Sequence, residues 1–258
     1  MASALQAATT PSKPNIVFIL ADDLGFAELS CNGADAYKTP NIDALAKGGI
    51  RFNHFYTVPL CGPSRALILT GRYGFRTRAV DQDGSGTMAR EGEGAEVMTP
   101  TVLKKAGYTS AMIGKWGQIL PCGNATEWGF DYVLSFKASG IYWNVEKCAE
   151  LIKTSKLEGE KGAEGGVRAK PGPYNINEKE LKLANNEYMP DIMEKNAFQF
   201  LNANKDKPFF LYYSLSHVHA QILPTPDSKP MPEEADAAKR MAITYNDNIN
   251  YMDKLVGN

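Results

Sequence analysis

The sequence has no long apolar run, no excess of charge of one sign and few cysteines. No segment reaches the roughly 20 consecutive apolar residues of a membrane-spanning helix, so we expect no membrane span. A formal net charge of −1 over 258 residues argues against a general binder of nucleic acid or anionic membranes. Four scattered cysteines are too few for a disulfide scaffold, although one bridge between Cys122 and Cys148 is compatible with the sequence.

The N-terminal residues 1–13 lack the basic start and the apolar stretch of a signal peptide. We expect them to form a flexible leader, and a chain that begins just after a removed signal peptide would look the same. Residues 14–258 are enough for one large domain with a substantial buried core. The whole chain is 43% apolar and 22% charged, which is typical of a soluble globular protein.

Short apolar runs alternate with segments that carry helix-start and helix-stop signals. Ile16–Leu20 is an apolar run rich in β-branched residues and predicts a strand buried on both faces. Proline near the first helical position and glycine after the last one mark the helix ends. The predicted helices are 39–49, 61–71, 99–107, 190–201 and a C-terminal helix through Leu255, and the further predicted strands are 108–113 and 208–215.

This alternation predicts an α/β layered fold with a central, largely parallel sheet flanked by helices. Two segments rich in glycine and charge, residues 81–96 and 153–174, are predicted to be loops or insertions. They are our candidates for the local part of any substrate specificity.

Polar residues follow three of the predicted strands. Asp22 and Asp23 come directly after the first strand, Lys115 after the second and His219 after the last. In open α/β sheets, ligands bind beyond the carboxyl ends of the strands. We therefore expect these four side chains at one edge of the sheet, although they lie far apart in the sequence.

Cys61 and Arg65 belong to the start of a predicted helix. Backbone N–H groups and the helix dipole favour an anion at such a position. Carboxylate oxygens suit Ca²⁺ or Mg²⁺, and clustered cations suit a tetrahedral oxyanion such as sulfate or phosphate. The pattern of residues indicates a metal-assisted ester hydrolase.

Each of these positions also has a purely structural interpretation. The Asp22–Asp23 pair is compatible with a solvated turn, and Lys115 with a surface lysine over the Trp116 ring. Arg65, one turn into a helix, is compatible with an exposed charge. Cys61 alone is compatible with a small buried apolar residue.

The pair His217 and His219 would point the same way in strand geometry, which suggests zinc. The chain has only three histidines, however, and the third, His54, is remote in sequence. Zinc is therefore the weaker choice, and we expect His217 to be a packed or hydrogen-bonded residue.

The segment Cys61-Gly62-Pro63-Ser64-Arg65, continued by Ala-Leu-Ile-Leu-Thr-Gly, resembles the signature of the type I sulfatase family. That signature is Cys-x-Pro-Ser-Arg followed by an apolar stretch and Thr/Ser-Gly. Four further segments are sulfatase-like and occur in the family's order: 14–25, 39–46, 114–116 and 208–213. The likeness runs from about Pro14 to the C-terminus, and five matches in order are highly specific.

The resemblance implies an alkaline-phosphatase-like fold and a nucleophile made by oxidation. A maturation enzyme would convert Cys61 to formylglycine, whose hydrated form is a geminal diol. One hydroxyl attacks sulfur and the alcohol leaves; the second hydroxyl then expels sulfate and regenerates the aldehyde.

The resemblance also assigns roles to the other residues. Asp22, Asp23 and the oxygen at position 61 would bind Ca²⁺, or alternatively Mg²⁺. Arg65 would hold the formylglycine and the developing charge. Lys115 and His219 would contact sulfate oxygens or assist the leaving group.

Two features depart from the family's pattern. Gly117, followed by Gln118, stands where the family often has a histidine after Gly-Lys-Trp. The family also has a later strand with a Ser/Thr-Asp-Asn/His-Gly motif and a smaller C-terminal domain, and neither is found before Asn258. We therefore expect a C-terminally truncated sulfatase domain that by itself binds Ca²⁺ weakly and has little or no activity.

The leading functional hypothesis is a sulfuric-ester hydrolase that acts on a sulfated carbohydrate or an aryl sulfate. The alternatives are a phosphoesterase or phosphonate hydrolase of the same superfamily, and a shortened, non-catalytic relative that only binds sulfated glycans. The implied protein partner is the formylglycine-generating maturation enzyme. Most members of the family are exported, which implies a periplasmic or extracellular location.

Overall fold

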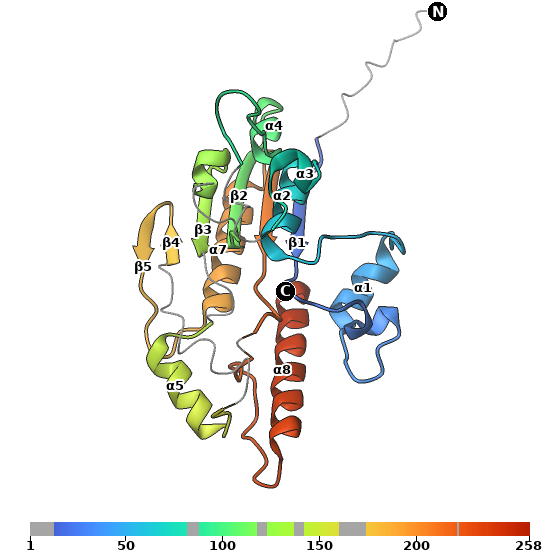
Figure 1. Cartoon of the computed structure of the whole chain (residues 1–258), viewed down its shortest axis with the longest axis vertical. Helices are drawn as coiled ribbons and strands as arrows, with labels where there is room; N and C mark the ends of the chain where they lie inside the picture. Colours follow the sequence, from blue (N-terminus) through green and yellow to red (C-terminus); the bar gives the residue numbers. More distant parts are fainter. Residues whose placement is uncertain (1–12, 82–87, 118–122, 137–141, 160–173, 221) are drawn as a thin grey trace, which may run out of the picture.

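A computed structural model describes residues 13–81, 88–117, 123–136, 142–159, 174–220 and 222–258 (Figure 1). Residues 1–12 of the expected leader lie outside this set. So do Gln118, Cys122 and the middle of both predicted loops.

Four neighbouring parallel strands make up one side of a six-stranded sheet. They are β1 (Ile16–Leu20), β6 (Phe209–Ser214), β2 (Thr109–Lys115) and β3 (Tyr132–Phe136), in that spatial order. The antiparallel strands β4 (Tyr174–Ile176) and β5 (Lys179–Leu181) extend the sheet beyond β3. The predicted α/β fold with a largely parallel sheet is confirmed, and β2 runs two residues further than expected, so that it ends at Lys115.

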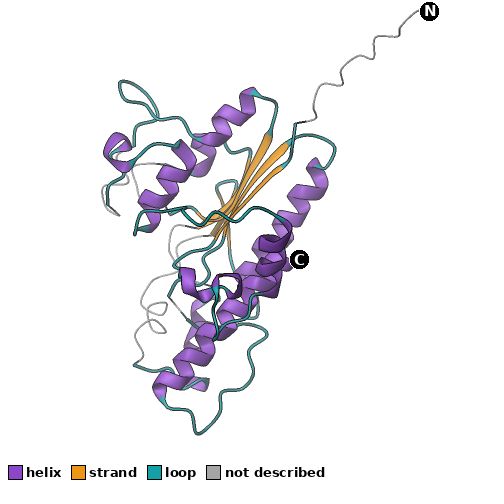
Figure 2. Cartoon of the chain, turned by 90° about the vertical axis from the view of Figure 1, so that its right-hand side faces the viewer, coloured by secondary structure: helices purple, strands orange, loops and turns teal. Residues whose placement is uncertain are grey.

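Helices cover the sheet on two sides, and Figure 2 shows the strands nearly edge-on between them. Phe210 and Tyr212 of β6 pack in one core with α2 (Cys61–Thr70), next to α3 (Gly74–Thr77) and α4 (Thr99–Lys105). Leu211 and Tyr213 point the other way, into a core with α5 (Val145–Thr154), α7 (Met189–Asn204) and α8 (Ala237–Gly257). The alternation along one strand therefore separates two apolar layers.

The prediction that the first strand is buried on both faces is wrong. Ile16, Phe18 and Leu20 pack against the core that contains α2, but Val17 and Ile19 remain 48% and 38% exposed. Within the described residues β1 pairs only with β6, so it is an edge strand of the sheet. An apolar run cannot reveal this, because burial of its second face depends on which elements cover it.

Most helix ends agree with the sequence signals. Gly71 follows α2 in the left-handed conformation with φ 67°, and its N–H donates to the Leu67 carbonyl. Helix α4 begins after Met98 rather than after Thr99, because the Thr99 hydroxyl donates to the Leu69 carbonyl at 2.9 Å instead of acting as a cap. No helix among the described residues is long and apolar enough to span a membrane.

A carboxylate from the last helix caps α1 (Pro40–Gly48). Thr39 precedes α1 as expected, but its hydroxyl bonds Ser30 and Asp43 and makes no cap bond. Instead the buried Asp253 accepts from the backbone N–H groups of Asn41 at 3.1 Å and Ile42 at 2.9 Å. This contact ties α1 and the short helices η1 (Phe26–Glu28) and η2 (Ser30–Asn32) beside it to α8.

Candidate active site

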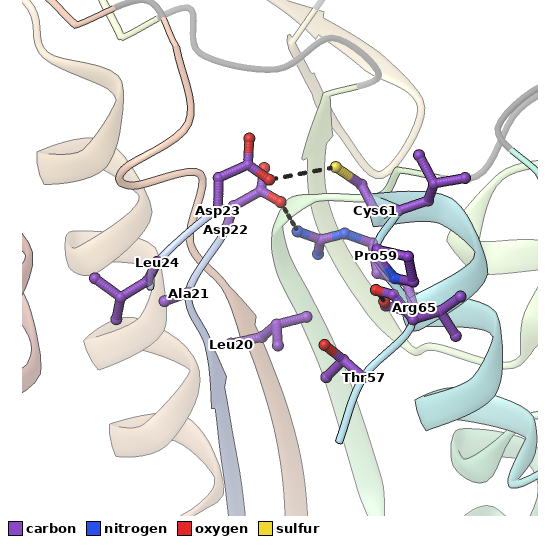
Figure 3. Close-up of a pocket in the computed structure, with 12 residues that line it drawn as sticks. Leu20, Ala21, Asp22, Asp23, Leu24, Thr57, Pro59, Cys61 and Arg65 are labelled. Carbon is purple, nitrogen blue, oxygen red and sulfur yellow. Dashed lines mark hydrogen bonds and ion pairs between the residues drawn. The ribbon is translucent and has the colours of Figure 1, made fainter. Parts of the chain in front are cut away.

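A pocket of about 370 Å³ lies at the carboxyl end of β1, where the segment that leads into α2 passes it. It is lined by residues 20–24 from one side and by 57–61, Ser64 and Arg65 from the other. Figure 3 shows Asp22 and Asp23 facing Cys61 and Arg65 across it. Two parts of the chain that are about 40 residues apart thus form the two walls of one pocket.

Cys61 occupies the first position of α2, and the segment before it is folded against the helix. The Ser64 hydroxyl donates to the Val58 carbonyl at 2.6 Å, which holds the chain in a turn. The Cys61 sulfur lies 4.0 Å from an Asp23 carboxylate oxygen. Burial raises the pKa of the Cys61 thiol, and Asp22 and Asp23 add to this while Lys115 opposes it. The unmodified thiol is therefore protonated and a weak nucleophile at neutral pH.

Asp22 is buried between two cations. Its carboxylate lies 2.5 Å from Lys115 Nζ and 3.3 Å from an Arg65 guanidinium nitrogen. Burial by itself would raise the pKa of Asp22, but Lys115 and Arg65 outweigh it and lower that pKa below its usual value. Asp22 is therefore a carboxylate at neutral pH, and it neutralises part of a doubly cationic pocket floor.

The surface interpretations of Lys115 and Arg65 are wrong. Each residue is only 1% exposed, and neither side chain lies over an exposed face of the protein. Lys115 ends β2 and points at Asp22, and Arg65 reaches the same carboxylate from α2. Sequence reasoning placed Lys115 at this edge and Arg65 at a helix start, but only the packing of α2 on the sheet shows that both are buried.

Asp23 differs from its neighbour in backbone and environment. It has a positive φ of 57°, and its side chain is 56% exposed. The residue before it is clamped to the loop after β6, because Asp22 N–H donates to the His217 carbonyl and Val218 N–H donates to the Asp22 carbonyl, both at 2.7 Å. This clamp brings the polar ends of β1 and β6 together.

His219 lies beside Asp23, and its ligand atom is within 4.8 Å of those of Asp22 and Cys61. Its Nε2 lies 3.5 Å from Asp23 Oδ2, and its Nδ1 lies 2.6 Å from the Ala220 carbonyl oxygen. A carbonyl can only accept, so Nδ1 carries the proton and Nε2 faces the pocket. The loop is held by the buried Tyr142, whose hydroxyl donates to the Ser216 carbonyl at 2.7 Å.

His217 is a packed residue, as expected. It is completely buried, its ring stacks on Tyr142 with 4.6 Å between centroids, and its Nε2 lies 3.0 Å from the Tyr188 hydroxyl. Burial lowers the pKa of His217 to about 3. The imidazole is therefore neutral, and its described contacts are with Tyr142 and Tyr188.

Sequence reasoning missed Ser214, the last residue of β6. Its hydroxyl accepts a hydrogen bond from Arg65 and donates one to the Lys115 carbonyl at 2.7 Å. The signal available was only its place at the end of an apolar strand, a few residues before His217 and His219.

The donor atoms fit part of the shell of a hard divalent cation. Among the described residues, ligand atoms of Asp22, Cys61 and His219 lie within 4.8 Å of one another, and the exposed Asp23 carboxylate is beside them. Carboxylate oxygens suit Ca²⁺ and Mg²⁺, whereas three histidines for zinc do not assemble here. The fold and the pocket together define an α/β protein with acidic and basic side chains clustered around a cysteine at the carboxyl edge of its sheet.

Comparison with known proteins identifies the family. A family model described as Sulfatase matches residues 14–258. The N-acetylgalactosamine-6-sulfatase of Mus musculus is 34% identical over 231 residues, which are 84% of this chain and 42% of that protein. Human arylsulfatase A is 33% identical over 224 residues, 80% of this chain and 41% of that protein. The chain belongs to the sulfatase family.

Solved structures agree with this assignment. Ps i-CgsB in complex with k-i-k-neocarrahexaose has a TM-score of 0.71 at 28% identity, over 95% of this chain and 54% of that one. A phosphonate monoester hydrolase of Agrobacterium radiobacter, with a TM-score of 0.58 at 18% identity, shares the fold. The chain spans about half the length of the curated relatives that it matches.

Proposed function

We propose that residues 14–258 form the nucleophile-bearing part of a sulfuric-ester hydrolase domain whose substrate is a sulfated carbohydrate or an aryl sulfate. The observation that carries this proposal is that five charged or titratable side chains cluster around Cys61, two of them, Lys115 and His219, through their contacts with Asp22 and Asp23. The five are Asp22, Asp23, Arg65, Lys115 and His219. The names of relatives that act on sulfated sugars support the substrate class.

The nucleophile in this proposal is formylglycine made from Cys61 by a maturation enzyme. In its hydrated form the residue supplies a hydroxyl that attacks sulfur as the alcohol departs. The raised pKa of the Cys61 thiol supports this, because an unmodified, protonated thiol at this position is a poor nucleophile.

A divalent cation, Ca²⁺ or alternatively Mg²⁺, would be held by Asp22, Asp23 and the residue at position 61. When bound, it would polarise the sulfate and favour ionisation of the attacking hydroxyl. Asp22 is suited to this because its lowered pKa keeps it ionised. Asp23 is suited because its exposed carboxylate can turn without disturbing buried partners.

The remaining residues would bind and balance charge. Arg65 and Lys115 present two buried cations toward a sulfate group at the start of α2. In its doubly protonated form His219 would donate the Nε2 proton to the leaving oxygen, while Nδ1–H stays bonded to the Ala220 carbonyl. An exported location, periplasmic or extracellular, is part of the proposal because the resemblance to the family implies it.

The test begins with maturation. The protein is co-expressed with a formylglycine-generating enzyme, and the peptide that contains Cys61 is weighed for the loss of about 18 Da that marks conversion of thiol to aldehyde. No loss would contradict the formylglycine proposal and favour a non-catalytic binder of sulfated glycans.

A full-length, matured form of the protein is then assayed in parallel on p-nitrophenyl sulfate and p-nitrophenyl phosphate, with and without a chelator. We expect a preference for the sulfate ester, loss of activity with the chelator, and no activity in Cys61→Ala. A strong preference for phosphate would instead indicate a phosphoesterase or phosphonate hydrolase.

A further inference from the structure

The Arg65 side chain is held at three points around its guanidinium. One terminal nitrogen donates to the Lys115 carbonyl at 3.0 Å and to the Ser214 hydroxyl, and the other lies 3.3 Å from Asp22. Arg65 is 1% exposed, so no contact is weakened by bulk water. The contacts with Lys115, Ser214 and Asp22 therefore fix the orientation of the Arg65 guanidinium.

Ser214 is the neutral side chain in this arrangement, and its hydroxyl has a defined orientation. The hydroxyl proton is donated to the Lys115 carbonyl at 2.7 Å, which turns the oxygen lone pairs toward Arg65. Ser214 is fully buried at the end of β6. The strand ends of β2 and β6 thus hold one guanidinium nitrogen between a carbonyl and a hydroxyl.

Gly117 borders the stem of the same arginine. Its φ is +69°, and a Cβ added there would lie 2.6 Å from Arg65 Cδ and 2.8 Å from Arg65 Nε. Real carbon atoms do not approach so closely, and a side chain would also be strained at this φ. Arg65 Nε is buried without a hydrogen-bond partner among the described residues, and it is one of the two Arg65 atoms that an added Cβ would meet.

We propose that Ser214 and Gly117 are positioning residues for Arg65: Ser214 fixes the guanidinium at its end, and Gly117 leaves the space through which its stem passes. The inference rests on the proposed function in one respect, that the oriented cation binds a sulfate group. It has a specific consequence at position 117, where the family resemblance leads one to expect a histidine. With Arg65 in this conformation, a histidine there would displace the arginine rather than add a useful base.

The experiment measures the conformation of the Arg65 side chain and the binding of sulfate separately. Side-chain N–H signals of Arg65 are recorded by NMR and assigned by their loss in Arg65→Lys. Binding of inorganic sulfate is measured by calorimetry, with and without Ca²⁺. The variants are Ser214→Ala, Gly117→Ala and Gly117→His.

Two control variants make the same kinds of change, loss of a buried hydroxyl and addition of a Cβ at a glycine with positive φ, at positions away from the pocket. Ser110→Ala removes a buried hydroxyl at the other end of β2. Gly129→Ala adds a Cβ at a glycine with φ +100° that would lie 2.5 Å from the Thr101 hydroxyl. Circular dichroism checks that each variant is folded. If Gly117→His is unfolded, the Arg65 signals and the sulfate affinity of Ser214→Ala and Gly117→Ala still test the proposal.

We expect the Arg65 signals to be protected from exchange in the unaltered protein and both controls, and to shift or disappear in the three variants. Sulfate affinity should fall about tenfold in Ser214→Ala, since a hydrogen bond to a charged group is lost. It should fall at least as much in Gly117→His. Unchanged Arg65 signals in Ser214→Ala, or sulfate binding in Gly117→His as tight as in the unaltered protein, would overturn the proposal.

The two proposals fail in different ways. If the unaltered protein binds no sulfate while its protected Arg65 signals are lost in the variants, the proposed function fails and the positioning role stands. If the protein binds sulfate and the variants behave like the controls, the positioning role fails and the proposed function stands.

Discussion

Two adjacent aspartates in this protein have opposite environments. Asp22 is 4% exposed and lies between the buried cations of Lys115 and Arg65, whereas the Asp23 side chain is 56% exposed and lies at the rim, 3.5 Å from His219. The first is a fixed part of the pocket floor, and the second is free to adjust to a ligand. The same residue type therefore serves stability at one position and, by our proposal, mainly ligand binding at the next.

The largest expected difference between the two is in stability. Asp22→Asn leaves Lys115 and Arg65 buried without a counter-charge and should lower the free energy of unfolding by roughly 3–5 kcal/mol. Asp23→Asn loses only an exposed ion pair and should cost less than about 1 kcal/mol. Urea denaturation of both variants measures this. Equal losses would show that the buried cluster is not what distinguishes the two residues.

Acid unfolding sharpens the comparison. Because the folded protein lowers the pKa of Asp22, its stabilising contribution is complete above the ordinary value of 3.8 and is lost as pH falls further. Denaturation followed from pH 5 to pH 2 should therefore show a steeper loss in the unaltered protein than in Asp22→Asn. Parallel curves for these two proteins would contradict the assignment of Asp22 as the acid-sensitive carboxylate.

His217 adds a separate acid effect that begins at higher pH. Burial lowers its pKa from 6.5 to about 3, so the unfolded chain binds a proton before the folded protein does. Stability should decline as pH falls below 6.5, and the imidazole of the folded protein should not titrate between pH 5 and pH 8. NMR titration of the imidazole checks this, and a midpoint near 6 would show that His217 is not buried as described.

A third aspartate tests whether burial or neighbouring cations contribute more to the stability lost when an aspartate is replaced by asparagine. Asp253 is buried, forms no ion pair among the described residues, and is held by N–H groups of Asn41 and Ile42 at the start of α1. Asp253→Asn removes a charged helix cap and should cost about 1–2 kcal/mol, less than Asp22→Asn. The measurement is urea denaturation at low and high salt. A loss as large as that of Asp22→Asn would mean that burial alone sets the cost.

Asp23→Asn, which should change stability least, should clearly weaken the binding of Ca²⁺. If Asp23 is a cation ligand, Asp23→Asn should weaken Ca²⁺ binding by roughly tenfold or more while the protein stays folded. Calorimetry with CaCl₂ measures this, and Asp35→Asn, at another exposed aspartate, is the matched control. Equal Ca²⁺ affinity in the two variants would remove Asp23 from the proposed ligand set.

Local signals in the sequence predicted several elements well. The Pro and Gly signals bounded α1 and α2, and the apolar runs located β1, β2 and β6 to within two residues. These features depend on neighbouring residues only, so they can be read without the fold. The rule that ligands bind beyond the carboxyl ends of parallel strands also predicted correctly that Lys115 and His219 lie at the same edge of the sheet.

Burial and partners could not be predicted in the same way. Lys115 and Asp22 are 93 residues apart, and Arg65 and Ser214 are 149 residues apart. The exposure of Val17 and Ile19 likewise depends on what lies against β1. Such properties follow from long-range packing, which no local pattern contains.

The sequence by itself determined the chemistry of this site: which residue types stand after the strands, and that a cysteine and an arginine begin a helix. Only the tertiary structure decided which aspartate is buried, which histidine faces the pocket, and that Ser214 and Gly117 border Arg65. The physical reason is that strand and helix signals act over a few residues. The environment of a charge is set by segments that meet only when the sheet has formed.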